Sequence, residues 1–377
     1  MAEKQILIIA GEPSGDLNAS YLVNAIKEIK PEIKICGIGG ELMRQAGVET
    51  YADIKDFAVL GLFDVLKKLP KFIALKNFIL KKIREEKFDA LILVDFSGFN
   101  LRLAKAINKR LPTIYYVSPQ VWASRRGRMG TIQKYISKMI VLFKFEKDFY
   151  KQYGMEVDFV GHPLLDIVKP TQTKEEFLKK YGISLEKKCI LLMPGSRKSE
   201  ILNILPVMKQ VAFLLKRQLP EVEFLIAKPK NLELALYKEI LKDAGLDFKI
   251  IEGLPYDCLN ASDFCLVASG TATLETAIMQ KPFVIIYKMG TLNYLLYRPQ
   301  VKLPFIGMVN IVAGKRIIPE FIQTRARPKL IADYVVHTLN NPARLTQITQ
   351  NLAQIKILLG EPGASKRAAK IILDFIK

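Results

Sequence analysis

Two short loops in the second half of the chain combine the residue types of an anion-binding site. One loop contains Gly195, Ser196 and Arg197 after the apolar run 189–193, and the other contains Ser269, Gly270 and Thr271 after the apolar run 264–268. Both loops lead into segments with helical character, and the N–H groups at the start of a helix favour a negatively charged ligand. Arg197 adds a planar fork of donors that suits a diphosphate, and Glu275 could accept hydrogen bonds from a ribose. Each loop alone is more often an ordinary capped turn, but their recurrence with an arginine favours a nucleotide.

Other ligand classes are disfavoured by missing motifs. The chain has no GxxxxGK[ST] sequence, which argues against P-loop hydrolysis, and GIGGEL (37–42) is only a partial dinucleotide fingerprint after the wrong strand. Its four cysteines contain no CxxC pair, it has only two histidines, and no Asp-x-Asp pair occurs. We therefore expect no metal site, no disulfide framework and no cofactor.

A carboxylate after another apolar run is a candidate general base. Asp95 follows the run 90–94 in the stretch VDFSGFN (94–100), so it would face the ligand side of a parallel sheet and be partly removed from water. Partial burial raises the pKa of a carboxyl group and makes it a better base near neutral pH. The alternative is structural, with Asp95 or Ser97 capping the helix that follows.

The stretch GEPSGD (11–16) follows the first apolar run in the same way. Its residues Ser14, Gly15 and Asp16 could form a loop that contacts an acceptor substrate. The polar side chains could equally cap a helix. The residues by themselves leave both possibilities open.

The order of apolar runs and helical segments predicts the fold. The expected strands are 5–10, 32–38, 90–94, 113–117, 139–143 and 157–160 in the first half, and 189–193, 222–227, 248–251, 264–268 and 283–287 in the second. Continuous apolar strands separated by helices indicate parallel sheets covered on both faces. We predict an α/β protein of two Rossmann-like domains, residues 1–168 and 169–377, with a linker near 162–173. Ligands bind beyond the carboxyl ends of such strands, so the domains are expected to face each other across a cleft.

The segment 59–89 is different in kind. Its apolar residues include Leu62, Phe63, Leu66, Leu69 and Phe72, and lysines alternate with them. This pattern is commonest in a core helix with a solvated lysine face, yet it also suits a helix lying in an anionic lipid surface. The net charge of +20 attracts polyanions in general, namely nucleic acid, anionic lipid or phosphorylated substrates. We expect neither a signal peptide nor a membrane-spanning helix.

The motifs together resemble those of the lipid-A-disaccharide synthase family, bacterial glycosyltransferases with the GT-B fold. The matching stretches are GEPSGD (11–16), VLGLFDVL (59–66), VDFSGFN (94–100), YVSPQVWA (116–123), FEKDFY (145–150), FVGHP (159–163), MPGSR (193–197), ASGTATLE (268–275) and VNIVAG (309–314). They cover nearly the whole chain in the family's order. Each motif alone is weak, but the set is highly specific.

The resemblance implies a reaction and roles for individual residues. Members of the family join UDP-2,3-diacylglucosamine to 2,3-diacylglucosamine 1-phosphate through a β-1′→6 linkage and release UDP, so the UDP-sugar is a substrate. By the same resemblance Asp95 is the general base, Ser14 belongs to the active-site loop, and Arg197 lies near the UDP phosphates. Asn310 lies in the nucleotide cleft, and Glu275 is the acid beside the nucleotide-binding turn.

The resemblance also implies the surroundings in which the protein works. The segment 59–66 corresponds to the family's membrane-contacting segment, which favours a cytoplasmic protein on the inner face of the inner membrane. Homodimers with exchanged C-terminal segments are expected, so residues 365–377 would pack back on an N-terminal domain. Ser97 departs from the family, where proline is common, and this change could loosen the loop that carries Asp95.

Two alternatives stay open at this level. Another UDP-sugar enzyme of the same fold, such as a peptidoglycan glycosyltransferase or an epimerase, would share the nucleotide loops, although an epimerase needs further acid–base residues. A basic module that binds nucleic acid or membrane without catalysis would share the charge. The single tryptophan and scattered aromatic residues make a base-stacking surface for nucleic acid unconvincing.

Overall fold

The computed structural model describes residues 4–57, 62–243, 245–290, 294 and 303–377. They form two α/β units, of which the first comprises Met1–Pro163 with Gly360–Lys377 and the second Leu164–Leu359. The division lies five residues before the expected boundary after residue 168, because the short helix α7 (Leu164–Ile167) packs on α12 (Ala272–Ile278) of the second unit.

The first unit contains a parallel sheet with the strand order β3-β2-β1-β4-β5-β6-β7. Its strands are β1 (Gln5–Ala10), β2 (Lys34–Gly39), β3 (Glu49–Asp53), β4 (Ala90–Val94), β5 (Thr113–Tyr116), β6 (Lys138–Val141) and β7 (Asp158–Phe159). Sequence analysis missed β3, an edge strand with the polar sequence ETYAD whose residues are only half-buried or exposed. An edge strand lacks the continuous apolar run that revealed the central strands.

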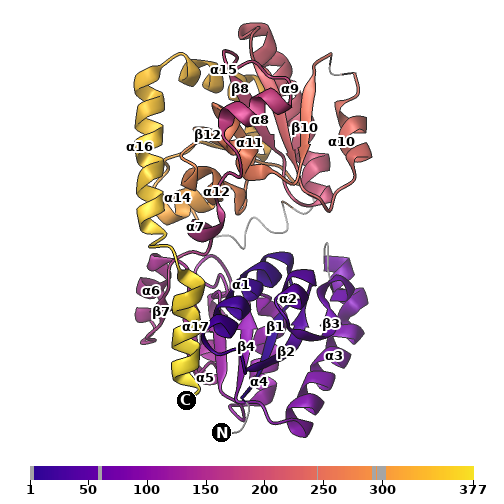
Figure 1. The fold of residues 1–377 in the computed structure, drawn as a ribbon, viewed down its shortest axis with the longest axis vertical. Coiled ribbons are helices and arrows are strands. Elements are labelled where there is room, and N and C mark those ends of the chain that lie inside the picture. Colours follow the sequence, from indigo (N-terminus) through magenta and orange to yellow (C-terminus); the bar gives the residue numbers. More distant parts are fainter. Residues whose placement is uncertain (1–3, 58–61, 244, 291–293, 295–302) are drawn as a thin grey trace. The chain divides into compact units, whose positions relative to one another are not determined.

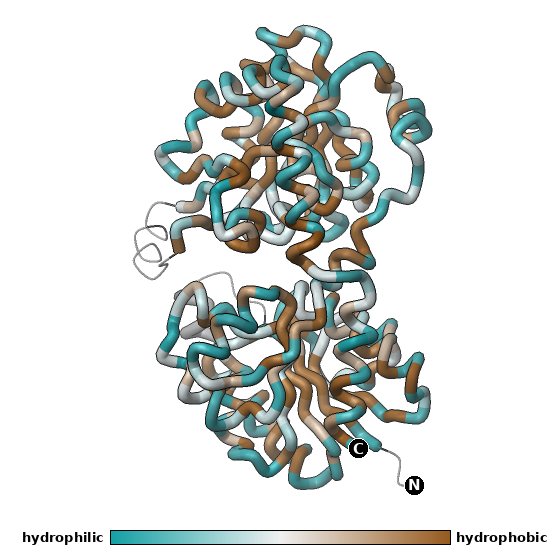
Figure 2. The backbone as a smooth tube through the Cα atoms, turned by 90° about the vertical axis from the view of Figure 1, so that its left-hand side faces the viewer, coloured by the Kyte–Doolittle hydropathy of each residue, from teal (hydrophilic) through white to brown (hydrophobic). Residues whose placement is uncertain are grey.

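Helices cover both faces of this sheet, as Figure 1 shows. They are α1 (Pro13–Ile29), α2 (Glu41–Gln45), α3 (Leu62–Glu85), α4 (Ser97–Ile107), α5 (Met129–Tyr135), α6 (Lys144–Lys151) and α17 (Ala364–Phe375), with 3-10 turns at Ile54–Phe57 and Arg126–Arg128. Alternate residues of β1 belong to two different hydrophobic cores. Ile6 and Ile8 pack with α1, α2 and α17, whereas Leu7 and Ile9 pack with α3, α4 and α5. Figure 2 shows the central strands as the most hydrophobic part of this unit.

The C-terminal helix α17 completes the first unit by packing on α1 of the same chain. Ala364, Ala368 and Ile372 enter the core on that face. At the rim Lys366 Nζ lies 2.7 Å from Glu28 Oε1. The helix thus buries its apolar stripe against a unit that begins more than three hundred residues earlier in the sequence.

The second unit contains another parallel sheet, in the order β10-β9-β8-β11-β12-β13. Its strands are β8 (Cys189–Met193), β9 (Glu223–Lys228), β10 (Phe248–Glu252), β11 (Phe264–Ala268), β12 (Phe283–Tyr287) and β13 (Glu320–Ile322). Its further helices are α8 (Lys174–Lys180), α9 (Lys198–Gln218), α10 (Leu234–Leu241), α11 (Pro255–Ala261), α14 (Met308–Ala313), α15 (Pro328–Leu339) and α16 (Pro342–Leu358). The three-residue edge strand β13 was not expected from the sequence, since it is too short to show a pattern.

Both sheets reverse their strand order beside the first strand of the unit. In the first unit β1 lies between β2 and β4, and in the second β8 lies between β9 and β11. At such a switch point the connections leave in opposite directions, which opens a crevice at the carboxyl ends of the two strands. The loops after β1 and β4, and those after β8 and β11, therefore lie at the positions where such folds bind ligands.

Candidate functional site

Asp95 lies at the switch point of the first sheet in a strained turn. Asp95 and Phe96 both adopt the left-handed conformation, with φ values of 50° and 44°. Non-glycine residues in this region cost about 1–3 kcal/mol each and persist where the surroundings hold them. Here the Phe96 ring stacks 5.3 Å from that of Phe99 and lies so close to Gly11 that a Cβ there would come within 2.2 Å of it.

The backbone and side chain of Asp95 are both held by hydrogen bonds. Asn100 Nδ2 donates to the carbonyls of Val94 at 3.3 Å and Asp95 at 2.9 Å, and the Tyr115 hydroxyl also donates to the Asp95 carbonyl. Ser14 Oγ donates to Asp95 Oδ2 at 3.2 Å. Burial, together with the Asp95 charge, raises the pKa of Tyr115, so this donor keeps its proton. The carboxylate is thereby fixed at the carboxyl end of β4.

Neither Asp95 nor Ser97 occupies the N-cap position of the helix that follows. Helix α4 begins at Ser97, and its N-cap is Phe96, whose side chain makes no capping hydrogen bond. Ser97 Oγ instead accepts a hydrogen bond of 2.8 Å from Arg128 Nη1. This bond links the start of α4 to the 3-10 turn Arg126–Arg128. Ser97 is therefore held in place, whereas a looser loop was expected from serine at this position.

The three residues expected to form an acceptor loop lie within the first turn of α1, which begins at Pro13. Ser14 reaches Asp95, and a Cβ on Gly15 would make an ordinary contact of 3.6 Å with the Asp95 Cβ, so the first turn of α1 packs directly beside Asp95. Asp16 is 4% exposed and accepts the N–H groups of Gly40, Leu42 and Met43 at 2.7–3.2 Å. Asp16 therefore caps α2, and the expectation that it contacts substrate is corrected to a structural role.

In the second unit, a carboxylate of the protein already accepts N–H groups of the first expected phosphate loop, residues 195–197. Glu200, in the first turn of α9, accepts the N–H groups of Ser196 at 2.8 Å and Arg197 at 3.3 Å. Gly195 has a φ of 123°, and a Cβ there would lie 2.3 Å from Glu200 Oε2. The two N–H groups are thus satisfied inside the protein, contrary to the expectation that they await an anion. The Arg197 side chain, 61% exposed, lies 3.4 Å from Glu200 and can still reach outward.

The second loop lies one strand away, after β11, which pairs with β8. Ser269 Oγ donates to the Ile306 carbonyl at 2.9 Å, Gly270 has a φ of 155°, and Thr271 is exposed as the N-cap of α12. Glu275 accepts a hydrogen bond of 3.2 Å from the Tyr256 hydroxyl. Burial raises the pKa of Glu275, so its carboxyl group holds a proton more tightly than usual.

Asn310 is buried, and its amide is fully used within the protein. Its Nδ2 donates to the Ile318 carbonyl and to Glu320 Oε1, and its Oδ1 accepts the N–H groups of Ile317 and Ile318, all at 2.8–3.0 Å. Glu320 also accepts the N–H of Gly307 at 2.9 Å. Asn310 therefore holds the segment that supports Ser269, and its amide is not turned toward solvent as direct contact with a nucleotide would require.

Of the five residues expected to contact a membrane, the structure describes the side chains of Leu69 and Phe72. The side chains of Leu62, Phe63 and Leu66 lie outside the described part of the chain. Leu69 is 39% exposed. Phe72 is half-buried, with its ring 5.9 Å from Phe96 and 6.2 Å from Phe99, so it belongs to the aromatic cluster behind Asp95.

A buried acid that sequence analysis did not single out lies beyond β5 and β6. Glu146 is 3% exposed, accepts hydrogen bonds from Trp122 Nε1 at 3.0 Å and the Phe143 N–H at 3.2 Å, and has a pKa raised by burial to about 7. Burial lowers the pKa of the nearby His162 to about 4, with its ring 5.1 Å from Phe143. The motif FEKDFY contains Glu146 and the motif FVGHP contains His162, but neither motif indicates which partner the side chain contacts.

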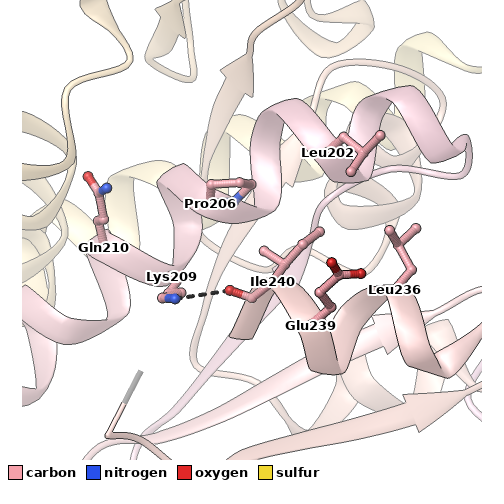
Figure 3. A pocket seen from close by; sticks show the side chains of 7 residues that line it. All are labelled: Leu202, Pro206, Lys209, Gln210, Leu236, Glu239 and Ile240. Carbon is pink, nitrogen blue, oxygen red and sulfur yellow. Dashed lines mark hydrogen bonds between the residues drawn. The ribbon is translucent and has the colours of Figure 1, made fainter. Parts of the chain in front are cut away.

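Other features of the described residues lie apart from these motifs. Figure 3 shows a pocket of about 380 Å³ between α9 and α10, where Lys209 Nζ donates to the Ile240 carbonyl at 3.0 Å. Its lining includes none of the residues predicted for the site. Among the described residues no group of His, Cys, Asp or Glu could hold a metal ion, and no helix is both long and apolar enough to cross a bilayer.

Comparison with known proteins identifies close relatives. A family model described as lipid-A-disaccharide synthetase matches residues 6–375. The chain is 41% identical over 379 residues to the lipid-A-disaccharide synthase of Syntrophus aciditrophicus, an alignment that covers 100% of this chain and 99% of that one. Its identity to the lipid-A-disaccharide synthase of Geobacter sulfurreducens is 38% over 373 residues, with 99% and 97% covered.

Solved structures are similar at the level of the fold. The UDP-GlcNAc 2-epimerase of Neisseria meningitidis bound to UDP-GlcNAc has a TM-score of 0.62 at 13% identity, covering 98% of this chain and all of that one. The calicheamicin glycosyltransferase has a TM-score of 0.61 at 14% identity, with 100% and 99% covered. Together with the two parallel sheets, these likenesses show the GT-B fold.

Proposed function

The chain belongs to the lipid-A-disaccharide synthetase family and is a glycosyltransferase of lipid A biosynthesis, and we propose that it transfers 2,3-diacylglucosamine from UDP to 2,3-diacylglucosamine 1-phosphate. The observation that carries the proposal is the carboxylate of Asp95, held by Ser14 at the switch point of the first sheet. Family membership supplies the reaction class, and this geometry supplies a base for it.

On the acceptor side, Asp95 takes the proton of the 6-hydroxyl. The hydroxyl oxygen attacks the anomeric carbon of the donor as the bond from that carbon to the UDP oxygen breaks, which inverts the anomeric centre. Asn100 and Tyr115 fix the backbone of Asp95, so the base is oriented before the substrate binds. The strained φ values of Asp95 and Phe96 are consistent with an imposed geometry, since strain of this kind gathers at functional sites.

On the donor side, Arg197 and the turn 269–271 bind the UDP diphosphate. The exposed guanidinium of Arg197 offers paired donors for the charge that develops on departing UDP. Glu275 accepts hydrogen bonds from the ribose, and Asn310 acts indirectly by holding the segment that carries Ile306 and thus Ser269. No metal or other cofactor is required in this proposal, because protein donors stabilise the leaving group.

Product analysis of the Asp95→Asn variant tests the proposal. Wild-type protein mixed with the two acylated sugars should yield the disaccharide 1-phosphate by mass spectrometry, and Asp95→Asn should lower kcat by about a thousandfold or more. UDP should bind the variant with unchanged affinity, because Asp95 belongs to the first unit. A near-normal kcat in the variant would refute the base assignment, and no disaccharide from the wild type would refute the substrates.

The same protein is proposed to act peripherally at the anionic inner face of the inner membrane. Helix α3 exposes Leu69, Ile73 and Phe78 by 39–48%, beside the exposed Lys71. Apolar side chains flanked by lysines gain both burial and attraction at an anionic surface. Sedimentation with vesicles should show binding that rises with anionic lipid and falls in Ile73→Ser, while the control Leu185→Ser, 57% exposed in the second unit, should bind normally.

A homodimer with exchanged C-terminal segments is also proposed. Gly360 and Gly363, with φ values of 90° and 91°, delimit a short connection between α16 and α17 that could redirect the last helix to a second chain. A short bismaleimide cross-link between Glu28→Cys and Lys366→Cys reports the outcome, because the tips of the two long native side chains meet at 2.7 Å and the linker replaces the length that the cysteines lack. Exchange should join two chains on a denaturing gel, whereas a cross-link closed within one chain would contradict it.

A further inference from the structure

Three arginines near Asp95 form a cationic cluster that the reaction described so far does not use. Arg128 is half-buried and donates to Ser97 Oγ at 2.8 Å. Burial lowers the pKa of Arg128, and the positive charges of Arg125 and Arg102 lower it further. Arg125 lies in the same turn, since the Arg128 N–H donates to the Arg125 carbonyl at 3.0 Å, and Arg102 lies on α4, the helix that begins at Ser97; both side chains are exposed.

No acidic side chain offsets this cluster within the described residues. Arg102, Arg125 and Arg128 form no ion pair there, whereas Arg44 lies 2.9 Å from Glu41 and 2.8 Å from Asp53. A half-buried guanidinium beside two like charges is unfavourable without an anion, since removing a charge from water costs free energy that only a counter-charge offsets. The arrangement therefore points to a negatively charged ligand from outside the chain.

The position of the cluster indicates which part of a ligand it would meet. Arg128 contacts Ser97, whose Cα lies at most ~7 Å from that of Asp95 because only Phe96 separates them in the chain. Tyr115 links the two groups, since its hydroxyl donates to the Asp95 carbonyl and its pKa responds to the charges of both Asp95 and Arg128. A single sugar ring could therefore reach from the base to the arginines.

We propose that Arg102, Arg125 and Arg128 bind the phosphate monoester of the acceptor sugar, with Ser97 orienting Arg128. The inference rests on the proposed acceptor, in which C1 with its phosphate and C5 with the reacting 6-hydroxymethyl group flank the ring oxygen of one sugar. Arginine forks match phosphate oxygens in pairs, so binding the phosphate would orient the hydroxyl toward Asp95. The site thereby selects acceptors that carry a phosphate over those with a 1-hydroxyl group.

The kinetic test compares two acceptors, 2,3-diacylglucosamine 1-phosphate and its 1-hydroxyl analogue. Arg128→Gln and Arg125→Gln should each lower kcat/KM for the phosphorylated acceptor by about tenfold to a hundredfold, while kcat/KM for the analogue and KM for the donor change by less than about threefold. Arg126→Gln is the matched control, because Arg126 is exposed in the same turn and is not among the charges acting on Arg128. Equal losses with both acceptors would overturn the proposal.

Ser97→Ala separates phosphate binding from support of the Asp95 turn. This variant removes the hydrogen bond to Arg128 but keeps the guanidinium charge. It should retain most of the preference for the phosphorylated acceptor, whereas Arg128→Gln should lose it. If Ser97→Ala lowered kcat with both acceptors as much as Arg128→Gln, the arginine would serve the turn and not the phosphate.

A binding experiment keeps the inference independent of turnover. Calorimetry with glucosamine 1-phosphate, glucosamine and inorganic phosphate should show the tightest binding for the sugar phosphate, lost in Arg128→Gln and kept in Arg126→Gln. Failure of turnover with this binding intact would refute the reaction but not the phosphate site. If these variants instead weakened sedimentation with phosphatidylglycerol vesicles and left glucosamine 1-phosphate binding unchanged, the cluster would serve the membrane and the proposal would fall.

Discussion

Replacing Glu146 by glutamine tests the link between burial and proton binding in the first unit. In the folded protein, burial raises the pKa of Glu146 from the ordinary 4.5 to about 7. The unfolded chain releases this proton near its ordinary pKa, so between about pH 4.5 and pH 7 the folded state holds more protons than the unfolded state. The free energy of unfolding should therefore fall as pH rises through this window.

The size of the effect follows from the same pKa values. A tenfold difference in proton affinity corresponds to about 1.4 kcal/mol, so a rise from 4.5 to about 7 corresponds to ~3 kcal/mol. The glutamine variant cannot ionise and should lack this dependence. It should also lose acceptance at one of the two carboxylate oxygens, which bind Trp122 Nε1 and the Phe143 N–H, but that loss is the same at every pH.

The assay uses the only tryptophan in the chain, which is Trp122 itself. Urea unfolding followed by its fluorescence at several pH values between about 4 and 8 gives the free energy of unfolding of wild type and Glu146→Gln. The difference between the two should change by ~3 kcal/mol across this range, and contributions from His162 cancel because both proteins contain it. Emission of folded wild-type protein should also titrate near pH 7.

An exposed carboxylate provides the matched control. Glu85, with a side chain 53% exposed and 3.6 Å from Lys81, lies on α3 of the same unit. Glu85→Gln should leave the pH dependence of wild type unchanged. If the difference between wild type and Glu146→Gln stayed constant within about 1 kcal/mol from pH 4 to pH 8, the buried acid would not hold its proton and the reasoning would be refuted.

Three further outcomes follow from single contacts. Asp16→Ala should lower the free energy of unfolding by about 3 kcal/mol, because three N–H groups of α2 lose their acceptor; a loss under about 1 kcal/mol in urea unfolding would contradict the capping role. Gly11→Ala should lower the free energy of unfolding by about 1–3 kcal/mol and also lower kcat, since its Cβ would meet the Phe96 ring at 2.2 Å. Gly98→Ala is the control: a Cβ there would meet nothing within 4 Å, so this variant should be neutral or slightly stabilising in the same measurements. Arg197→Ala should raise the donor KM about tenfold to a hundredfold and leave the acceptor KM unchanged; steady-state kinetics with unaltered donor KM would count against the phosphate role.

The pattern of residues along the chain was enough to predict the two parallel sheets and the placement of the main motifs. Central strands such as β4 and β8 are buried on both faces, so each appears as a continuous apolar run that can be recognised without its partners. Residues directly after such strands must lie at the carboxyl edge of the sheet, which is why Asp95 and Arg197 could be located as candidates. The edge strands β3 and β13 were not predicted, because half-buried or very short strands lack a continuous apolar run.

The partner of each polar side chain, in contrast, depends on how distant parts of the chain pack together. Asp16 caps a helix twenty-five residues later in the chain, Asn310 closes a network with Glu320, and Ser97 pairs with Arg128. The same residue types in the same local patterns would also fit ligand contacts, because carboxylates, amides and hydroxyls serve both purposes. Their partners come from other elements, and the distances between those elements are set by packing of the apolar cores, which no local spacing encodes.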